Sequence, residues 1–132
     1  MDVIHGYRTI FPAPIAQALP FDPEMSKRAA SVAAREASAA GIHVVFSPMV
    51  DLVRDPRWGR VMESTGEDPY LNSRFAAAQI HGFQGDDMKE DGKVCGCIKH
   101  FAGYAVPKPE GNIITVQVSE AYVPRVNYHA LL

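Results

Sequence analysis

A cluster of charged side chains marks residues 55–71, "DPRWGRVMESTGEDPYL". The stretch carries two arginines, one tryptophan and four carboxylates, in a chain that is otherwise rich in alanine. Guanidinium groups donate several hydrogen bonds and carboxylates accept several, so such a cluster can surround a polar ligand. The same composition is typical of a solvated surface on which Asp and Arg pair with one another. The residue types alone leave both interpretations open.

Two short apolar runs predict β-strands that are buried on both faces of a parallel sheet. They are "IHVVF" at residues 42–46 and "VCGCI" at residues 94–98, and nearly unbroken apolar runs of this length are typical of such strands. The segment "DVIHG" at residues 2–6 is interpreted as the last part of a preceding strand. The sequence therefore predicts at least two parallel strands and the end of another.

Helices are predicted between these strands. Asp22 can cap the free N–H groups of a first turn, Pro23 suits the first helical position, and Gly41 ends the helix. Asp68 and Pro69 repeat the same signal for a second helix. The stripe of the first helix that faces the sheet is expected to consist of Met25, Ala29, Val32 and Ala33.

The alternation of strand, loop and helix predicts an α/β fold with a parallel sheet and right-handed crossovers. In such folds ligands bind beyond the carboxyl ends of the strands, because each strand delivers its following residues into one crevice. Asp2, the loop from Asp51 to Arg60, and the pair Lys99 and His100 each lie just past a predicted strand. We therefore expect these charged groups to meet at one edge of the sheet.

The composition argues against several classes of partner. With 13 basic and 15 acidic side chains the formal net charge is −2. The chain therefore lacks the excess of positive charge that favours binding to nucleic acid or to an anionic membrane. We recognise no membrane-spanning run and no signal peptide, and the compartment stays undetermined. The sequence has no Gly-rich nucleotide loop and no G-x-S-x-G elbow, and we expect no cofactor.

Two residue types that could carry chemistry are interpreted as structural. Cys95 and Cys97 lie in an apolar strand without a second pair of metal ligands, so we predict reduced, buried thiols that hold no metal. The indole of Trp58 could stack on a sugar ring. A lone tryptophan between Arg57 and Gly59 is nevertheless more typical of a residue that fixes its loop by packing, and we expect that role.

Five stretches occur in order and at suitable intervals over about residues 2–120: "DVIHGYRTIFP", "AAREASAAGIHVVFSPMVDLVRDPRWGR", "ESTGEDPYL", "GFQGDD" and "KHFAGY". Together they resemble successive motifs of glycoside hydrolase family 3, the β-glucosidase and β-xylosidase family. The resemblance implies that residues 1–132 are the N-terminal portion of a (β/α)8 barrel of the TIM type, with about two to three of its eight strand–helix units. It also implies retaining hydrolysis of terminal β-D-glucosyl or xylosyl residues.

The resemblance assigns sugar-binding roles to four residues. Asp2 matches an aspartate that accepts hydrogen bonds from hydroxyls of the terminal sugar, and Arg60, the second arginine of "PRWGR", matches a sugar-contacting arginine. Lys99 and His100 match a Lys–His pair that donates to ring hydroxyls. Arg57 is expected to brace the loop. The expected partner is therefore a β-linked oligosaccharide or glucoside, bound in the −1 subsite.

The carboxylates that break the glycosidic bond find no match. A retaining glycosidase needs a nucleophile and an acid/base about 5 Å apart. In the family the nucleophile is an aspartate in a later segment, usually followed by tryptophan, whereas the single tryptophan of this chain is Trp58. A further arginine common after "KHF" has no counterpart around Gly111, and the sequence departs from the family after Ser119 and Glu120. We therefore assign no catalytic residue and expect the isolated chain to be inactive.

The chain is shorter than a closed barrel of this type. A closed barrel takes about 250 residues, so 132 residues would leave sheet edges open. The chain is then a fragment of a longer polypeptide, or another chain covers its edges, or exposed apolar surface favours self-association. A catalytically inactive sugar-binding or structural module is the alternative to a hydrolase.

Overall fold

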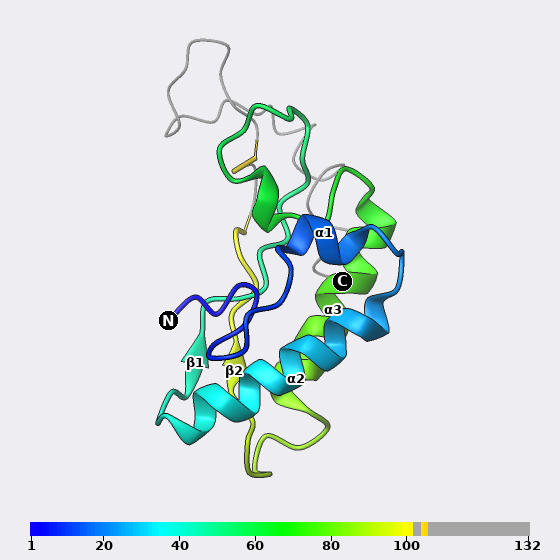
Figure 1. The fold of residues 1–132 in the computed structure, drawn as a ribbon. Helices are drawn as coiled ribbons and strands as arrows, with labels where there is room; N and C mark the ends of the chain where they lie inside the picture. The colour runs from blue at the N-terminus through cyan, green and yellow to red at the C-terminus, as the bar shows by residue number, and fades with distance from the viewer. Residues whose placement is uncertain (102–103, 106–132) are drawn as a thin grey trace.

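The structure is a computed structural model that describes residues 1–101 and 104–105. Its elements are, in order, α1 (Pro14–Ala18), α2 (Pro23–Ala39), β1 (Val44–Val45), the 3-10 helix η1 (Val61–Glu63), α3 (Pro69–Gln84) and β2 (Cys95–Gly96). The two strands pair in parallel, so the predicted α/β organisation is confirmed. Figure 1 shows α2 and α3 packed together beside the strands, with the loop that carries η1 beyond the strand ends. The expectations at Gly111, Ser119 and Glu120 lie outside the described residues.

The two long helices begin where the sequence predicts. The Asp22 carboxylate accepts hydrogen bonds from two N–H groups of the first turn of α2, at 3.0 and 3.4 Å. The Asp68 carboxylate accepts one from Leu71 N at 2.6 Å in α3, and both helices have proline at the first position. Gly41 follows α2 with a φ of +79°, a conformation that favours glycine. None of the described helices is long and apolar enough to span a membrane.

The contact surface of α2 differs from the predicted stripe. Ala33 is buried as expected, but Met25, Ala29 and Val32 are only half-buried. The stripe that packs inward consists of Ser26, Ala30, Ala33, Ala34 and Ala37. In an alanine-rich helix several stripes are small enough to pack closely, so the partner helix α3 decides which one is used.

Helix α3 selects this stripe through a buried polar chain. Gln79 Nε2 donates to Ser26 Oγ at 2.8 Å, and Ser26 Oγ donates to Gln17 Oε1 at 3.0 Å. Gln17 Nε2 in turn donates to Pro12 O at 2.7 Å. Buried polar groups must be paired in this way to avoid a desolvation penalty. The chain therefore ties α1, α2 and α3 together and holds the N-terminal loop on the helices.

The strands are shorter than the apolar runs that predict them. Residues 42–46 and 94–98 contribute two residues each to the sheet, although a bridge between Met49 and Lys99 continues the parallel pairing. Residues 2–6 make only isolated bridges and form no strand of this sheet. Phe46 N nevertheless donates to Met1 O at 2.8 Å. The N-terminal segment therefore lies against β1 as an irregular neighbour.

The sheet is covered by the described residues on one face only. Val45 is fully buried toward the helices, whereas its neighbour Val44 is 46% exposed. Cys95 and Cys97 are free and exposed, so the prediction that they are buried is wrong. Side chains alternate along a strand, which places both cysteines on the face of Val44. An apolar run shows that a strand has two apolar faces but not that both are covered.

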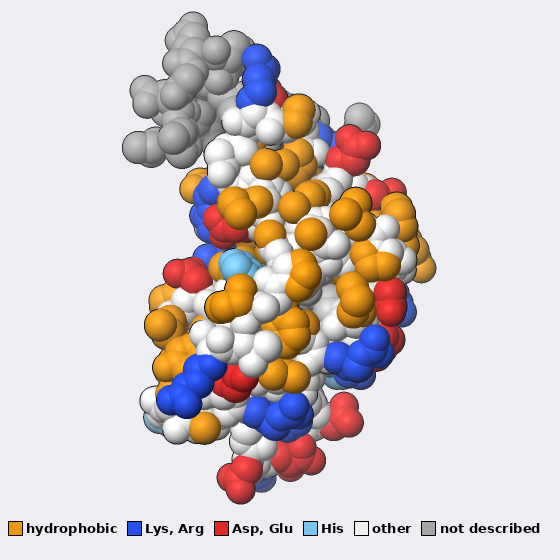
Figure 2. Space-filling model, viewed as in Figure 1, with side chains coloured by type: hydrophobic (Ala, Val, Ile, Leu, Met, Phe, Trp, Pro, Cys, Tyr) orange, Lys and Arg blue, Asp and Glu red, His pale blue; other side chains and the backbone are white. Residues whose placement is uncertain are grey.

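A second apolar surface lies over α1 and α2. Figure 2 shows hydrophobic side chains gathered there, with charged side chains around the lower rim. Ile10, Leu19 and Phe21, which flank α1 in the sequence, are among the exposed large hydrophobic residues. The expectation of exposed apolar surface is therefore met on the described residues.

Candidate functional site

The loops that follow β1 and β2 come together at the carboxyl ends of the strands. Val50 N donates to Lys99 O at 2.7 Å, and Lys99 N donates to Pro48 O at 3.1 Å. These backbone hydrogen bonds hold the segment after β1 beside the segment after β2. Asp51 and His100, the next residue on each segment, therefore lie side by side.

Packing and a local ion pair fix the loop between Asp51 and η1. Trp58 is buried and makes an edge-to-face contact with Tyr104, with ring centroids 5.8 Å apart. Its packing role is thus confirmed. Arg57 binds Asp55 with an Nη2 to Oδ2 distance of 2.6 Å, and these hydrogen bonds lower the pKa of Asp55 to about 2. Arg57 therefore braces the loop, as expected.

Buried hydrogen bonds hold the backbone on both sides of Asp51. Ser64 Oγ donates to Asp51 O at 2.7 Å, and Asn72 Nδ2 donates to Val50 O at 2.6 Å. Thr65 Oγ1 donates to Asn72 Oδ1 at 2.8 Å. These contacts attach the loop to α3 and hold the backbone at Val50 and Asp51 in place.

Asp2 and Lys99 form the first charged pair of the site. Lys99 Nζ donates to Asp2 Oδ1 at 2.8 Å, with side chains that are 17% and 64% exposed respectively. The hydrogen bond from Lys99 lowers the pKa of the Asp2 carboxyl. Asp2 is therefore held as an anion whose carboxylate is open to solvent.

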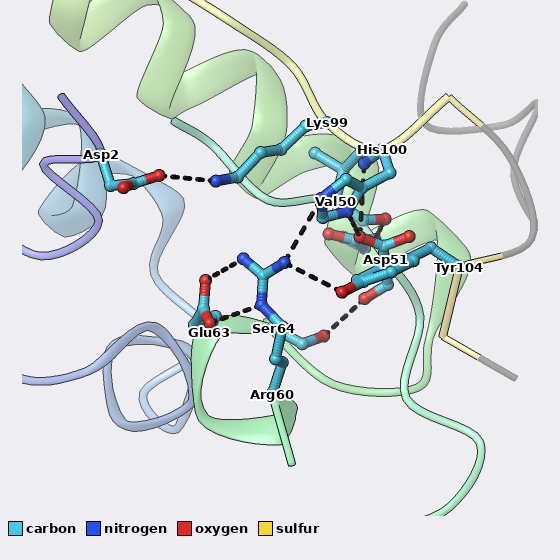
Figure 3. Close-up of polar contacts among 10 residues, drawn as sticks. Asp2, Val50, Asp51, Arg60, Glu63, Ser64, Lys99, His100 and Tyr104 are labelled. Carbon is cyan, nitrogen blue, oxygen red and sulfur yellow. Dashed lines mark hydrogen bonds and ion pairs between the residues drawn. The ribbon is translucent and has the colours of Figure 1, made fainter. Parts of the chain in front are cut away.

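Arg60 is the centre of the second charged group (Figure 3). It binds Glu63 in a bidentate manner, with Nε to Oε1 at 2.7 Å and Nη2 to Oε2 at 2.5 Å. This pairing raises the pKa of Arg60 and lowers the pKa of Glu63. The Nη1 group lies 3.3 Å from His100 Nε2 and 3.5 Å from the Tyr104 hydroxyl. Arg60 is therefore fully ionised and fixed in orientation.

His100 lies between Arg60 and a buried carboxylate. Its Nδ1 is 2.6 Å from Asp51 Oδ2, and its backbone N is 3.3 Å from the same oxygen. The Asp51 side chain is 1% exposed. The imidazole ring also packs on the Tyr104 ring, with centroids 4.1 Å apart. His100 is thus oriented from three sides.

An open pocket of about 360 Å³ lies beside these groups, within the range of volumes that small-molecule sites have. Asp2, Arg60 and Glu63 line it together with the mostly apolar Ile4, His5, Ala13, Pro14 and Met62. Lys99 and His100 do not line the pocket themselves, but each contacts a residue that does (Figure 3). Lys99 donates to Asp2, and His100 Nε2 contacts Arg60. The structure thus brings the four predicted site residues together. Within the described residues no group of three metal-ligating side chains occurs.

The sequence assigns no individual role to three residues of this site, although the loop that begins at Asp51 is expected at this edge of the sheet. Glu63 lies three positions after Arg60, a spacing at which helical side chains pair, and this signal could have identified it. Asp51 follows a strand, but its partner His100 is 49 residues away. Tyr104 stands in the "KHFAGY" motif, yet only the fold shows its contact with Arg60. Local spacing carries no information on such distant contacts.

An α/β domain with a pocket beyond the carboxyl ends of its parallel strands has the arrangement in which such folds commonly bind ligands. The model of the Glycosyl hydrolase family 3 N terminal domain matches residues 1–122. The chain belongs to this family, and the sequence resemblance is confirmed.

Named relatives are β-glucosidases and β-xylosidases. The chain is 37% identical to a periplasmic β-glucosidase of Salmonella typhimurium over 118 residues, and 44% identical to a β-xylosidase of Formosa agariphila over 103 residues. These alignments cover 89% and 76% of this chain but only 15% and 14% of the relatives. A mutant β-glucosidase from Listeria innocua in complex with laminaribiose superposes with a TM-score of 0.77 at 57% identity, over 79% of this chain and 15% of that one. The chain therefore spans about one seventh of the length of these relatives.

Proposed function

We propose that this chain supplies the sugar-binding half of the −1 subsite of a retaining glycoside hydrolase. Residues 1–132 would be the N-terminal portion of a (β/α)8 barrel of the TIM type, with about two to three of its eight strand–helix units. The observation that supports this most is the meeting of the pair Asp2 and Lys99 with Arg60 and His100 beside one pocket. The hydrolase would act on terminal, non-reducing β-D-glucosyl or xylosyl residues, as the names of the relatives suggest.

The charges of the site suit the recognition of hydroxyl groups. A carboxylate such as Asp2 accepts from two hydroxyls at once, while Lys99 and Arg60 only donate. Hydrogen bonds that involve an ionised partner are about twice as strong as neutral ones. A sugar that lacks a matching hydroxyl leaves a desolvated charge unpaired, so such a site discriminates strongly between sugars.

The ion pairs also hold these groups in place before a sugar binds. Arg60 is fixed by Glu63, and Lys99 is held by Asp2. Little side-chain entropy is then lost on binding, which improves affinity. These residues bind and orient the terminal sugar, and cleavage requires a nucleophile and an acid/base that we assign to no residue of this chain. The isolated chain would accordingly be inactive.

The exposed face of the sheet also bears on the proposed function. We infer that the sheet face of Val44, Cys95 and Cys97 is covered in the working hydrolase, because proteins rarely leave such sheet surface exposed. In the isolated chain, the same open edges favour self-association. A catalytically inactive sugar-binding or structural module remains the second candidate, and it differs from the first only in having no partner segment with catalytic carboxylates.

Titration of the ¹⁵N-labelled chain with laminaribiose, followed by NMR, tests the proposal. We expect shift changes at Asp2, Arg60, Lys99 and His100, and a loss of affinity of about tenfold in Lys99→Met, since one hydrogen bond to a charged group is removed. Lys89→Met, an exposed lysine outside the site, is the matched control and should bind as the wild type does. Equal affinity of Lys99→Met and the wild type would contradict the proposal.

A further inference from the structure

Asp51 is a buried carboxylate behind the proposed subsite, and it takes no direct part in lining the pocket. Its side chain is 1% exposed, and its backbone is fixed by the hydrogen bond from Ser64 Oγ to Asp51 O. Within the described part of the chain, the hydrogen bonds that its carboxylate accepts all come from His100. Asp51 therefore acts on the site through His100.

The contact with Asp51 defines one nitrogen of the imidazole. Asp51 Oδ2 lies 3.3 Å from the His100 backbone N, which can only donate. The same oxygen is 2.6 Å from Nδ1. An oxygen that accepts from the backbone N–H and faces a second nitrogen at this distance needs a hydrogen on that nitrogen. The geometry therefore places a proton on Nδ1.

The contact with Arg60 defines the other nitrogen. Arg60 Nη1 lies 3.3 Å from His100 Nε2, and a guanidinium group carries five donors and no acceptor. A hydrogen bond between these atoms requires that Nε2 accepts. In a neutral imidazole one nitrogen donates and the other accepts, and the partner of each nitrogen decides which. The contacts with Asp51 and with Arg60 therefore require the same tautomer of His100, with the proton on Nδ1.

We propose that Asp51 is a positioning residue that holds His100 as the neutral Nδ1–H tautomer, so that Nε2 presents a lone pair to the subsite. This inference rests on the proposed function for its ligand, a sugar. Nε2 has one lone pair, so a sugar hydroxyl that donates to it takes the place of Arg60 Nη1, whose contact with Nε2 is long at 3.3 Å. The neighbouring Lys99 can only donate. In this proposal the adjacent pair divides the two roles, in place of the two donors that the family resemblance implies. Such a site can accept a hydrogen bond from one hydroxyl of the sugar and donate a hydrogen bond to another.

The tautomer can be read in the full chain without any sugar. Long-range ¹H–¹⁵N NMR distinguishes a protonated from an unprotonated imidazole nitrogen, and above about pH 8 an unperturbed imidazole is neutral. We expect Nδ1 of His100 to be protonated and Nε2 to be unprotonated in the wild type. Asp51→Asn retains an oxygen that accepts from Nδ1–H and should keep this signature. Asp51→Leu removes the acceptor and should lose it. Asp55→Asn, a carboxylate of the same loop that binds Arg57, is the control and should leave it unchanged.

A protonated Nε2 in the wild type would overturn the proposal, and so would an unchanged tautomer in Asp51→Leu. If Asp51→Leu does not fold, the wild type and Asp51→Asn still decide the question. Glucose titration provides the functional measurement: we expect about tenfold weaker binding in Asp51→Leu and near wild-type binding in Asp51→Asn, and equal weakening in both would refute the positioning role. Absence of glucose binding in the wild type, together with the predicted tautomer, would reject the sugar site and leave the role of Asp51 toward His100 standing.

Discussion

Replacement of Gly82 by alanine should destabilise the chain, although alanine is the better helix former. Gly82 lies in α3 where this helix crosses α2. A Cβ atom there would lie 2.4 Å from the carbonyl oxygen of Lys27 and 2.6 Å from the Cβ of Ala30. Neither atom belongs to a flexible side-chain end, so the helices must separate to make room. Separation would loosen the buried alanine contacts that form the core.

Two opposing terms set the magnitude. Alanine in a helix interior is favoured over glycine by about 1 kcal/mol. Ordinary carbon–oxygen contacts need roughly 1 Å more than the available space, and overpacking of this kind costs about 1–3 kcal/mol or more. Because the contact is with backbone, we place the clash at or above the upper end of that range. The net loss in the free energy of unfolding should then be about 2 kcal/mol.

Urea denaturation followed by circular dichroism measures this loss. With a slope of about 1–3 kcal/mol per molar urea, the midpoint should fall by roughly 1 M. Gly59→Ala is the matched control, since a Cβ at Gly59 meets no atom within 4 Å and its φ is not in the left-handed region. We expect that variant to be as stable as the wild type or slightly more stable. A Gly82→Ala variant as stable as the wild type would show that α2 and α3 do not pack as described.

Three further outcomes follow from the structure. Asp68→Ala removes the cap of α3 and should lower the free energy of unfolding by about 1 kcal/mol, as measured by urea denaturation. The pKa of Glu63 is lowered in the folded chain by Arg60, so the pair stabilises the fold above the ordinary pKa of 4.5, and this contribution is lost as the pH falls through the lowered value. Glu63→Gln should therefore flatten the dependence of stability on pH in the acid range at and below the ordinary pKa of 4.5, and an unchanged profile would contradict the pairing. Cys95 and Cys97 are exposed and should both react with a thiol reagent in the native chain, whereas a requirement for denaturant would show that they are buried.

The helices of this chain could be predicted from local chemistry alone. Asp22 and Asp68 each precede a proline, and both carboxylates cap the free N–H groups that any helix start must satisfy. These signals act within a few residues, so the sequence displays them directly. The contacting stripe of α2 could not be read in the same way. It depends on Ser26 and Gln79, two residues that are 53 positions apart.

The sequence predicts which residues form the site, but it does not predict which of them contact one another. The loop from Asp51 to Arg60 and the pair Lys99 and His100 each follow an apolar run, and this position indicated that they would converge, because parallel strands share one edge. Asp2 follows only Met1, and the family resemblance assigned it to the site. The pairing of His100 with Asp51 arises only when β1 and β2 align in register, and it has no counterpart in local spacing. The burial of Cys95 was mispredicted for a related reason, since a strand sequence does not state what covers each of its faces.

A crystal structure of the chain with bound laminaribiose would test the central claim most directly. We predict that the terminal glucosyl unit lies in the pocket beside Asp2 and Arg60, with its hydroxyls within hydrogen-bond distance of Asp2, Arg60, Lys99 and His100. Nε2 of His100 should face a hydroxyl rather than a ring carbon. A sugar bound elsewhere, such as over the apolar surface of α1 and α2, with these four side chains free of it, would contradict the account.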